Sequence, residues 1–284
     1  MNSQTYRKIP SIEAIVSPVR RIYINLAGCN FNCRSCFAIA KYDVGREFTV
    51  SNLVEFILKI CSYIWGDIAS EAVLTGGEPT LNPSYMFNLI ERLKNLNMKV
   101  EVSTNGYLLA NKDYIDKLKK CCVDLVKIDL KAFSNGIHQW YTGKDNENVL
   151  KAIKLLHDQN INFLIRTIFI PEVVDFNEIE RIALFIAGIS RNIPYRIYQF
   201  VPSPGISRRP TRDEMIKALE IVKQYLNDVN ALIDVESFRA DWRHIEICSD
   251  DLYEVYRDIA EKSEKAIRGW KQRYRIVKMS EISK

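Results

Sequence analysis

The sequence predicts an α/β fold built on a parallel sheet. Six short runs rich in β-branched and apolar residues alternate along the chain with longer stretches of helical period. This alternation indicates repeated βαβ units, in which each helix crosses back over the sheet. Six such units can form part of a barrel or a flat doubly wound sheet, and the periodicity alone does not decide between the two.

The units follow one another in a regular order. The expected strands span 21–28, 71–77, 99–106, 124–132, 163–171 and 195–202. The expected helices begin at about Ser51, then span 83–97, 112–120 and 147–158, followed by one built on Ile179, Ile182, Ala183 and Ile186 and one that opens with a capping box from Thr211 to Glu214. Several strands are nearly continuous apolar runs, as expected where helices cover one face of a parallel sheet and the other face is turned inward.

Three segments make up the chain by this pattern. Residues 1–19 form an N-terminal segment, 20–230 the repeating core, and 231–284 a C-terminal extension. The extension opens with a candidate edge strand, ALIDVESF at 231–238, and continues into a helix rich in Tyr, Lys and Arg. No linker or low-complexity stretch separates the three segments.

Composition limits the classes of protein that fit. With 284 residues, 47% of them hydrophobic, the chain can bury a large core. It shows neither a secretory signal nor an apolar run long enough to span a membrane, and its seven cysteines form no disulfide framework. We therefore expect a cytoplasmic protein in a reducing compartment, without membrane contact. The net charge of +5 is mild, and residues 262–278 carry most of the excess, with seven Lys or Arg against one Glu.

Three cysteines stand close together at the end of the first expected strand. Cys29, Cys33 and Cys36 lie within eight residues. Zinc sites need four ligands, usually as two separated pairs, and no second pair of cysteines or histidines is spaced for this. Three thiolates that hold an iron–sulfur cube would leave one iron open to a substrate or cofactor. A non-catalytic iron–sulfur or zinc binding protein stays open as an alternative.

Other polar residues also fall where the expected strands end. In a parallel sheet these ends meet at one edge, where active sites collect. The residues in question are Gly76, Gly77, Glu78 and Pro79, then Ser103 and Asn105, then Asp129 and Lys131, and Arg166. The glycines alone also fit a tight turn, and Asp129 with Lys131 also fits a surface ion pair. Arg166, flanked by apolar residues on a buried strand, is costly unless it meets an anion.

Taken together, these motifs resemble the radical S-adenosylmethionine (radical SAM) superfamily, whose signature is C-x3-C-x2-C after the first strand. The match covers roughly residues 20–202, with CNFNCRSC, LTGGEPTLNP and VSTNGY in the family's order. Within the superfamily, KIDLKAF, HQWYTGKDNENVLKAI and FLIRTIFIP resemble glycyl-radical-enzyme activating enzymes of the pyruvate formate-lyase type. The resemblance implies a partial (β/α)6 barrel with a C-terminal helical extension.

The resemblance also implies a chemistry. A 4Fe-4S cluster on Cys29, Cys33 and Cys36 would bind S-adenosylmethionine and cleave it reductively to a 5′-deoxyadenosyl radical, which abstracts hydrogen from a substrate. By position, Gly76, Gly77, Glu78 and Pro79 would lie along the methionine end, where Glu78 and local backbone groups accept from the ammonium. Ser103 and Asn105 would lie near the ribose or carboxylate, Asp129 and Lys131 would face the cofactor, and Arg166 would bind an anionic group such as the carboxylate. The family usually has an aromatic residue before the third cysteine; Ser35 stands there, and Phe37 follows Cys36 as the candidate adenine contact.

Partners follow from the same resemblance. An activating enzyme implies a protein substrate that presents a glycyl-radical loop at the barrel mouth, and an electron donor such as flavodoxin or ferredoxin. A second hypothesis is RNA-base modification, because Trp270 and Tyr274 alternate with basic residues in the tail WKQRYRIVK. The simpler explanation of that tail is a solvated terminal helix.

Overall fold

The computed structural model describes residues 6–17, 19–203, 205–233, 242–266 and 274–283. Ten strands form one sheet in the order β10-β9-β8-β7-β6-β5-β3-β2-β11-β12, and β1 pairs with β4 in a separate antiparallel ribbon. The bounds of the strands are β1 Arg7–Ile9, β2 Ser11–Ser17, β3 Arg21–Leu26, β4 Arg46–Phe48, β5 Glu71–Gly76, β6 Lys99–Thr104, β7 Leu125–Asp129, β8 Phe163–Phe169, β9 Tyr195–Gln199, β10 Val229–Leu232, β11 Arg243–Cys248 and β12 Tyr274–Lys278.

The six predicted strands are confirmed as β3, β5, β6, β7, β8 and β9, which are neighbours in this order and all parallel. A further strand, β10, pairs in parallel with β9. It begins two residues before the candidate edge strand at 231–238, and residues 234–238 of that candidate lie outside the described part of the chain.

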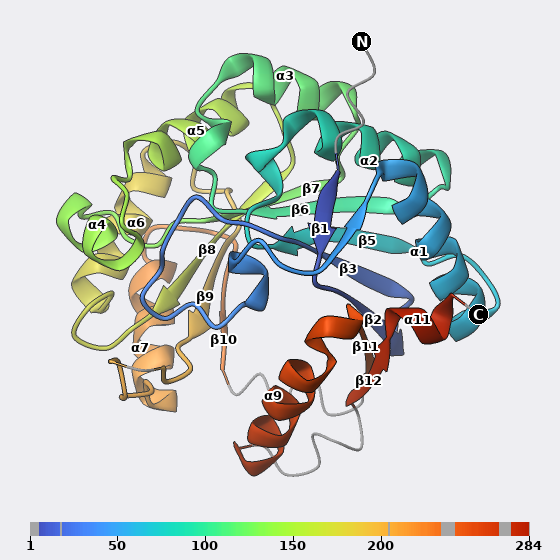
Figure 1. Cartoon of the computed structure of the whole chain (residues 1–284). Coiled ribbons are helices and arrows are strands. Elements are labelled where there is room, and N and C mark those ends of the chain that lie inside the picture. Colours follow the sequence, from blue (N-terminus) through green and yellow to red (C-terminus); the bar gives the residue numbers. More distant parts are fainter. Residues whose placement is uncertain (1–5, 18, 204, 234–241, 267–273, 284) are drawn as a thin grey trace.

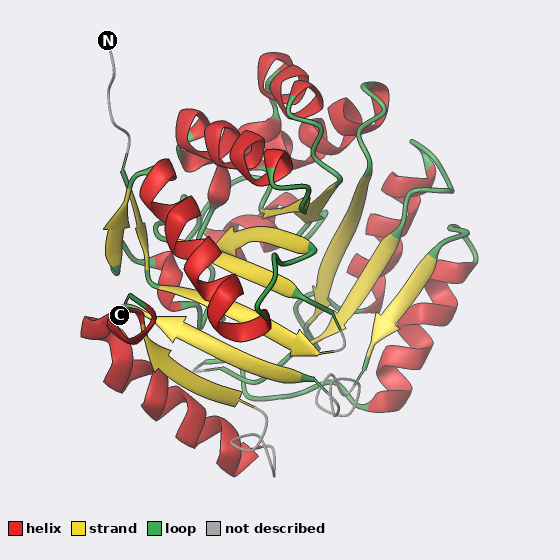
Figure 2. Cartoon of the chain, turned by 90° about the vertical axis from the view of Figure 1, so that its right-hand side faces the viewer, coloured by secondary structure: helices red, strands yellow, loops and turns green. Residues whose placement is uncertain are grey.

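Helices lie around the outside of the sheet in both views (Figures 1 and 2). Their bounds are α1 Val50–Trp65, α2 Pro83–Asn95, α3 Lys112–Lys120, α4 Asn135–Thr142, α5 Glu147–Asp158, α6 Phe176–Ala187, α7 Arg212–Lys223, α9 Tyr253–Ala266 and α11 Met279–Ile282. The predicted capping box at Thr211 is formed. Helix α4 is not among the predicted helices, because its eight residues carry too short an apolar pattern to show the helical period.

The two faces of the parallel strands differ in chemistry. On β7, Val126 and Ile128 are fully buried under the helices, whereas Lys127 and Asp129 on the opposite face are half-buried. Since successive side chains of a strand point to opposite faces, the same alternation along β8 and β9 puts Arg166, Arg196 and Tyr198 on the half-buried inner face, beside the apolar Ile168. The helices therefore cover an apolar outer face, and the inward face is free to carry functional groups.

Both ends of the chain extend this sheet. Strand β2 of the predicted N-terminal segment lies antiparallel between β3 and β11, and β12 pairs with β11 at the edge. The resemblance implied a helical C-terminal extension, and the structure adds two strands, β11 and β12, to its helix α9. The edge of β2 allows this, because β11 pairs with it. No helix among the described residues has the length and apolar character needed to cross a membrane.

Candidate functional site

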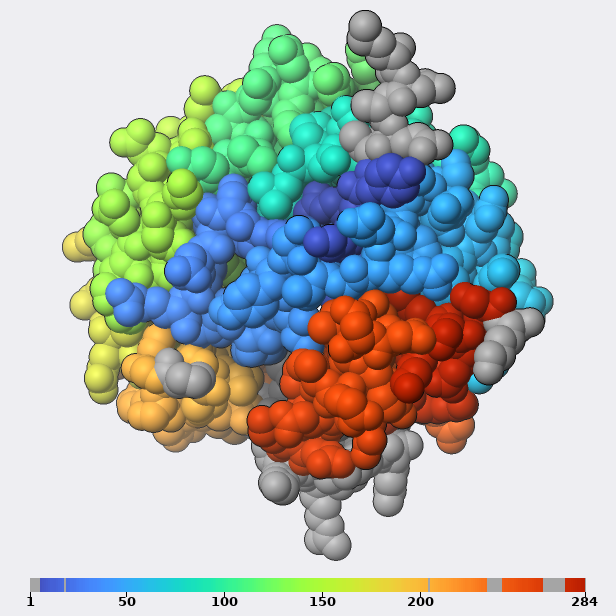
Figure 3. Space-filling view, viewed as in Figure 1, coloured from blue at the N-terminus to red at the C-terminus, as the bar shows by residue number. Residues whose placement is uncertain are grey.

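The three cysteines lie in the loop between β3 and β4, at the C-terminal end of β3. Cys29, Cys33 and Cys36 are all free and half-buried. Cys29 and Cys33 pack against the edge of the apolar core. In Figure 3 the segment that carries them, coloured blue, lies on the front surface beside the yellow-green of α4.

Helix α4 holds this loop in place. The backbone amides of Asn32 and Arg34 donate to the carbonyls of Thr142 (2.8 Å) and Tyr141 (3.0 Å), and Arg34 Nε donates to the Trp140 carbonyl (2.8 Å). The last carbonyls of a helix have no partner within the helix, so the cysteine loop caps α4. The stretch HQWYT, quoted only for its family resemblance, therefore has a physical role in fixing the loop.

Burial and nearby groups act in opposite directions on the charge of the thiols. Burial raises the pKa of Cys29 and that of Cys33, the latter to about 11, while the nearby Lys131 ammonium acts to lower both. The amide of Phe31 donates to Cys29 Sγ at 3.4 Å, and Asn105 Nδ2 lies 3.9 Å from the same sulfur. Within the described ranges, no three His, Cys, Asp or Glu side chains are arranged to hold a single metal ion.

This donor set fits an iron–sulfur cluster. Such clusters are held by cysteine thiolates, and N–H donors to sulfur together with a nearby cation stabilise their negative charge. The chain provides three thiols on one loop, the two N–H donors on Cys29, and the buried ammonium of Lys131. The residues around the three predicted ligands therefore fit such a cluster.

The double glycine allows two loops to meet. A Cβ atom on Gly77 would lie 2.1 Å from the carbonyl oxygen of Gly28 and 2.4 Å from that of Ala40, both closer than any side chain permits. The Glu78 amide donates to the Gly28 carbonyl at 2.7 Å, and Gly28 donates to Ala40 at 2.8 Å. The glycines thus do more than form a tight turn: they let the loop after β5 pack on the start and end of the cysteine loop.

Glu78 faces inward from this junction. Its carboxylate is fully buried and accepts from the Thr80 amide (2.9 Å), the Thr80 hydroxyl (2.6 Å), the Thr104 hydroxyl (2.7 Å) and the Asn105 amide (2.8 Å). Burial raises the pKa of Glu78, and these hydrogen bonds oppose the rise. The carboxylate is thus enclosed and ties the loop after β5 to the loop after β6. That Glu78 and nearby backbone groups accept from a ligand's ammonium stays a prediction.

Arg7 is a second buried residue that connects two loops, and it was not among the predicted residues. Its Nη2 donates to the carbonyls of Ala27 (2.7 Å) and Glu78 (2.8 Å), and its Nε donates again to Ala27 (3.1 Å). The guanidinium, 8% exposed, connects the end of β3 to the loop after β5. One isolated arginine in the N-terminal segment gave no motif from which this role could be found.

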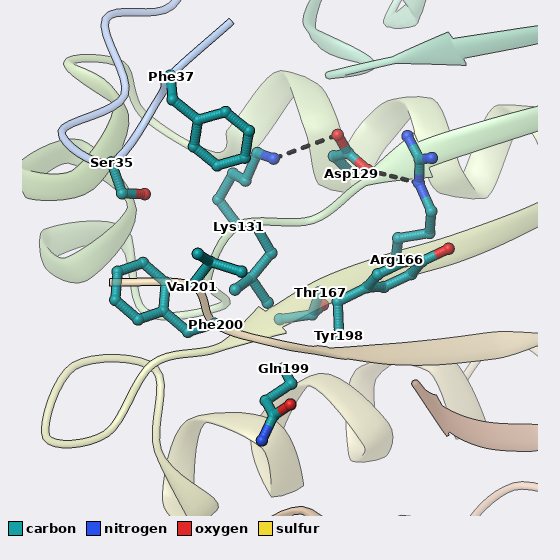
Figure 4. A pocket seen from close by; sticks show the side chains of 11 residues that line it. Ser35, Phe37, Asp129, Lys131, Arg166, Thr167, Tyr198, Gln199, Phe200 and Val201 are labelled. Carbon is teal, nitrogen blue, oxygen red and sulfur yellow. Dashed lines mark hydrogen bonds and ion pairs between the residues drawn. The ribbon is translucent and has the colours of Figure 1, made fainter. Parts of the chain in front are cut away.

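Three charged residues come together in a cavity of about 330 Å³ at the C-terminal ends of β7 and β8 (Figure 4). Asp129 accepts from Arg166 Nε at 2.7 Å and from Lys131 Nζ at 3.2 Å. Asp129 and Arg166 are directly paired in the register of β7 and β8. The expectation that Arg166 meets an anion is confirmed, and the pair of Asp129 and Lys131 lies inside the cavity rather than on the surface.

The charges in this cavity are mutually stabilised. Burial disfavours the ionised form of Asp129, but Arg166 and Lys131 more than offset it, so the pKa of Asp129 is lowered. Burial likewise acts to lower the pKa of Lys131, and Asp129 reverses this and raises it. All three groups stay charged near neutral pH, which leaves a net positive charge beside the cavity.

The remaining predicted residues are divided between the cavity and its supports. Phe37 lines the cavity at its rim and is 79% exposed, whereas Ser35 is buried and its hydroxyl contacts that of Tyr141. Asn105 donates to Asn30 at 2.7 Å beside the cysteine loop. Ser103 is half-buried on β6, outside the described lining of the cavity, while Tyr198, not predicted, contributes to that lining.

The basic tail is described only from Tyr274 onward. Trp270, the other aromatic residue of the RNA hypothesis, lies outside the described residues, and that hypothesis stays a prediction. Tyr274 begins β12, and its hydroxyl donates to the buried Glu246. Residues 274–278 therefore form a strand at the sheet edge, not a solvated helix, and the Tyr274 hydroxyl is already engaged within the fold.

Comparisons with known proteins find similarity in both sequence and fold. The model of the Radical SAM superfamily matches residues 24–186. A Methanocaldococcus jannaschii protein, named as a candidate glycyl-radical enzyme activating enzyme, is 35% identical over 73% of this chain and 78% of its own. Pyruvate formate-lyase-activating enzyme of Clostridium pasteurianum is 25% identical over 65% of this chain and 76% of its own. The fold is similar to a crystal structure of a domain of pyruvate-formate lyase-activating enzyme from Bacteroides vulgatus, with a TM-score of 0.52 and 23% identity over 58% of this chain and all of that one.

Proposed function

Because the chain belongs to the radical SAM superfamily, we propose that Cys29, Cys33 and Cys36 hold a 4Fe-4S cluster and that the cavity beside them receives S-adenosylmethionine. When bound, these groups supply reductive cleavage of the sulfonium to a 5′-deoxyadenosyl radical, which abstracts hydrogen from a substrate. The observation that carries the proposal is the cavity itself, which lies between the cysteine loop and the charged residues on β7 and β8.

The residues of the chain have distinct tasks in this proposal. Lys131 and Arg166 outnumber Asp129 by one charge, so this side of the cavity attracts a carboxylate such as that of the methionine moiety. The exposed ring of Phe37 offers a flat apolar face to the adenine. Since the Glu78 carboxylate is enclosed, contacts to the ammonium fall to backbone groups of Gly76, Gly77 and Pro79.

Asn105 has a supporting task. Its side chain joins Asn30 to the surroundings of Cys29, and its amide is fixed by Glu78, so it orients the cysteine loop toward the cavity. Ser103, which lies on β6 two residues before Asn105, is proposed to approach the ribose.

We further propose that the substrate is a protein that carries a glycyl-radical site. The support is the similarity to activating enzymes, which reaches 35% identity over most of both chains. The cavity opens near the exposed side chains of Phe37 and Val201, which are 79% and 49% exposed. Exposed apolar side chains at a cavity mouth are typical of a surface that a partner covers.

Anaerobic reconstitution tests this function. The unmodified chain should bind about four irons, as one 4Fe-4S cluster requires, and should form 5′-deoxyadenosine from S-adenosylmethionine with dithionite. Cys33→Ala should lose both properties. Cys122→Ala is the matched control, since Cys122 is exposed at the end of α3, and it should keep both. Tight zinc binding without deoxyadenosine would refute the proposal.

The activating role needs its own measurement. A candidate partner protein, incubated anaerobically with the reduced enzyme and S-adenosylmethionine, should acquire a glycyl radical that electron paramagnetic resonance detects. Deoxyadenosine formation that never yields a radical on any glycyl-radical protein tested, and that transfers deuterium from a small metabolite instead, would assign the enzyme to another substrate class.

A further inference from the structure

A second hollow, which we call the outer hollow, lies between the cysteine loop and the end of α4. This outer hollow, of about 400 Å³, is lined by Asn32, Cys33, Arg34, Lys41, Gln139 and Trp140. Cys33 is a proposed cluster ligand, and the described lining of the inner cavity does not include it. The outer hollow thus offers a route to the cysteine loop that does not pass through the proposed S-adenosylmethionine site.

The outer hollow has one sign of charge. Arg34 and Lys41 are cationic, and none of the described residues that line the hollow is acidic. Lys41 Nζ lies 3.4 Å from the Cys36 carbonyl, which places this charge directly beside the proposed cluster loop. A hollow of positive potential attracts a negatively charged partner and speeds its encounter.

An exposed Trp–Arg pair marks the edge of the outer hollow. Trp140 is 44% exposed, and the Arg34 guanidinium stacks on its ring at 4.7 Å from the centroid. The same ring also borders another hollow, of about 290 Å³, which lies near Ile137 and Val173. Tryptophan and arginine are the residues that most often carry the binding energy of protein interfaces. A tryptophan between two hollows is suited to anchor a protein partner.

From these observations we infer that the outer hollow is the docking surface for an acidic, one-electron donor protein. The inference rests on the proposed function, because reductive cleavage consumes an electron that S-adenosylmethionine does not supply. The donor loses one electron and the oxidised cluster gains it; no bond forms or breaks in this transfer. Donor entry at Cys33 leaves the cavity mouth near Phe37 free, so the donor and the substrate protein need not compete for one surface.

The test uses variants that change the charge of the outer hollow. Because Lys41→Glu also removes the 3.4 Å contact with the Cys36 carbonyl, a variant that keeps Lys41 is measured beside it. Lys41→Glu with Gln139→Glu lowers the charge of the outer hollow by three. The matched control is Lys117→Glu with Lys120→Gln, which lowers net charge equally at exposed positions on α3. Gln139→Glu alone serves as a milder variant, since its side chain is exposed and the change is nearly isosteric.

The probe is an acidic flavodoxin, used with the reconstituted full chain at low ionic strength. Calorimetry should show binding of oxidised flavodoxin weakened about tenfold or more in the double variant, and stopped-flow reduction of the cluster should slow in proportion. Dithionite-driven formation of deoxyadenosine should remain unchanged. Raising salt should weaken flavodoxin binding to the unmodified protein and reduce the difference in affinity between the unmodified protein and the double variant.

The outcomes separate two failures. If dithionite yields no deoxyadenosine in the unmodified protein, the proposed function fails and the docking inference fails with it. If dithionite activity is intact but flavodoxin binds the hollow variants, including Gln139→Glu, as well as the unmodified chain, only the docking surface is refuted. Equal weakening in the α3 control would also refute it, because the effect would then follow net charge rather than position.

Discussion

Asp129 is the charge on which the electrostatics of the cavity depend. It lies 3.2 Å from Lys131 Nζ and 2.7 Å from Arg166 Nε, and the three side chains are between 15% and 25% exposed. Asp129→Asn keeps the shape of the side chain and removes the charge. Breaking a fully buried pair costs about 3–5 kcal/mol and an exposed one about 0–1. This partly exposed triad lies between the two, so the free energy of unfolding should fall by about 2–3 kcal/mol at pH 7.

The sign of the pH dependence follows from the lowered pKa of Asp129. An acid whose folded-state pKa lies below its unfolded value of about 3.9 stabilises the fold above that value. Its contribution is lost only as pH falls through the folded-state pKa. The stability difference between Asp129→Asn and the unmodified chain should therefore stay constant from pH 7 to pH 5.

Urea unfolding followed by tryptophan fluorescence measures these differences. The double variant Asp129→Asn with Lys131→Met should recover at least 1 kcal/mol relative to Asp129→Asn, because one buried cation without a counter-charge is removed. A loss below about 0.5 kcal/mol in Asp129→Asn would show that solvent already screens the triad. A difference that closes between pH 7 and pH 5 would show that the pKa of Asp129 is not lowered.

Three further changes test other parts of the fold. Gly77→Ala should lower iron content after reconstitution and the melting temperature, because its Cβ would lie 2.1 Å from a backbone oxygen; Gly136→Ala, with open space around it on α4, should lower neither. Arg7→Met should reduce the free energy of unfolding by about 2–4 kcal/mol in urea, since two buried carbonyls lose their donor. Burial and Glu13 raise the pKa of Glu246 to about 7, so its protonated form is favoured in the fold and stability falls as pH rises from about 4.5 through 7. This fall in stability amounts to a free energy on the order of 3 kcal/mol, and Glu246→Gln should largely remove it, as thermal denaturation between pH 5 and pH 8 measures. If the stability of Glu246→Gln falls with pH as steeply as that of the unmodified chain, another group titrates.

The strands and the place of the site were predictable because parallel βαβ units leave little freedom. Once the alternating pattern defines β7 and β8, their C-terminal ends must meet at one edge of the sheet. The requirement that Arg166 meet an anion also follows from its apolar neighbours. The identity of that anion, Asp129, could not be predicted, because the register that sets Asp129 opposite Arg166 depends on the packing of the whole sheet.

Contacts between distant segments were not predictable. Arg7 donates to the Glu78 carbonyl, 71 residues away in the sequence, and no local period or motif indicates this hydrogen bond. The inward turn of Glu78 likewise depends on Thr104, which comes from the next strand. Polar residues at strand ends could thus be assigned to one region, whereas the choice between facing a ligand and bracing a loop required the tertiary structure.

The position before the third cysteine shows how such a brace shapes the site. Ser35 is 8% exposed and its hydroxyl contacts that of Tyr141, which is 2% exposed on α4. Ser35 also lines the cavity, so an aromatic ring at this position would lose the hydroxyl contact with Tyr141 and occupy part of the cavity. The small residue there is therefore matched to α4, the same helix that the cysteine loop caps. The proposed adenine contact then falls to Phe37, the only aromatic ring that the described part of this loop presents at the cavity rim beyond Cys36.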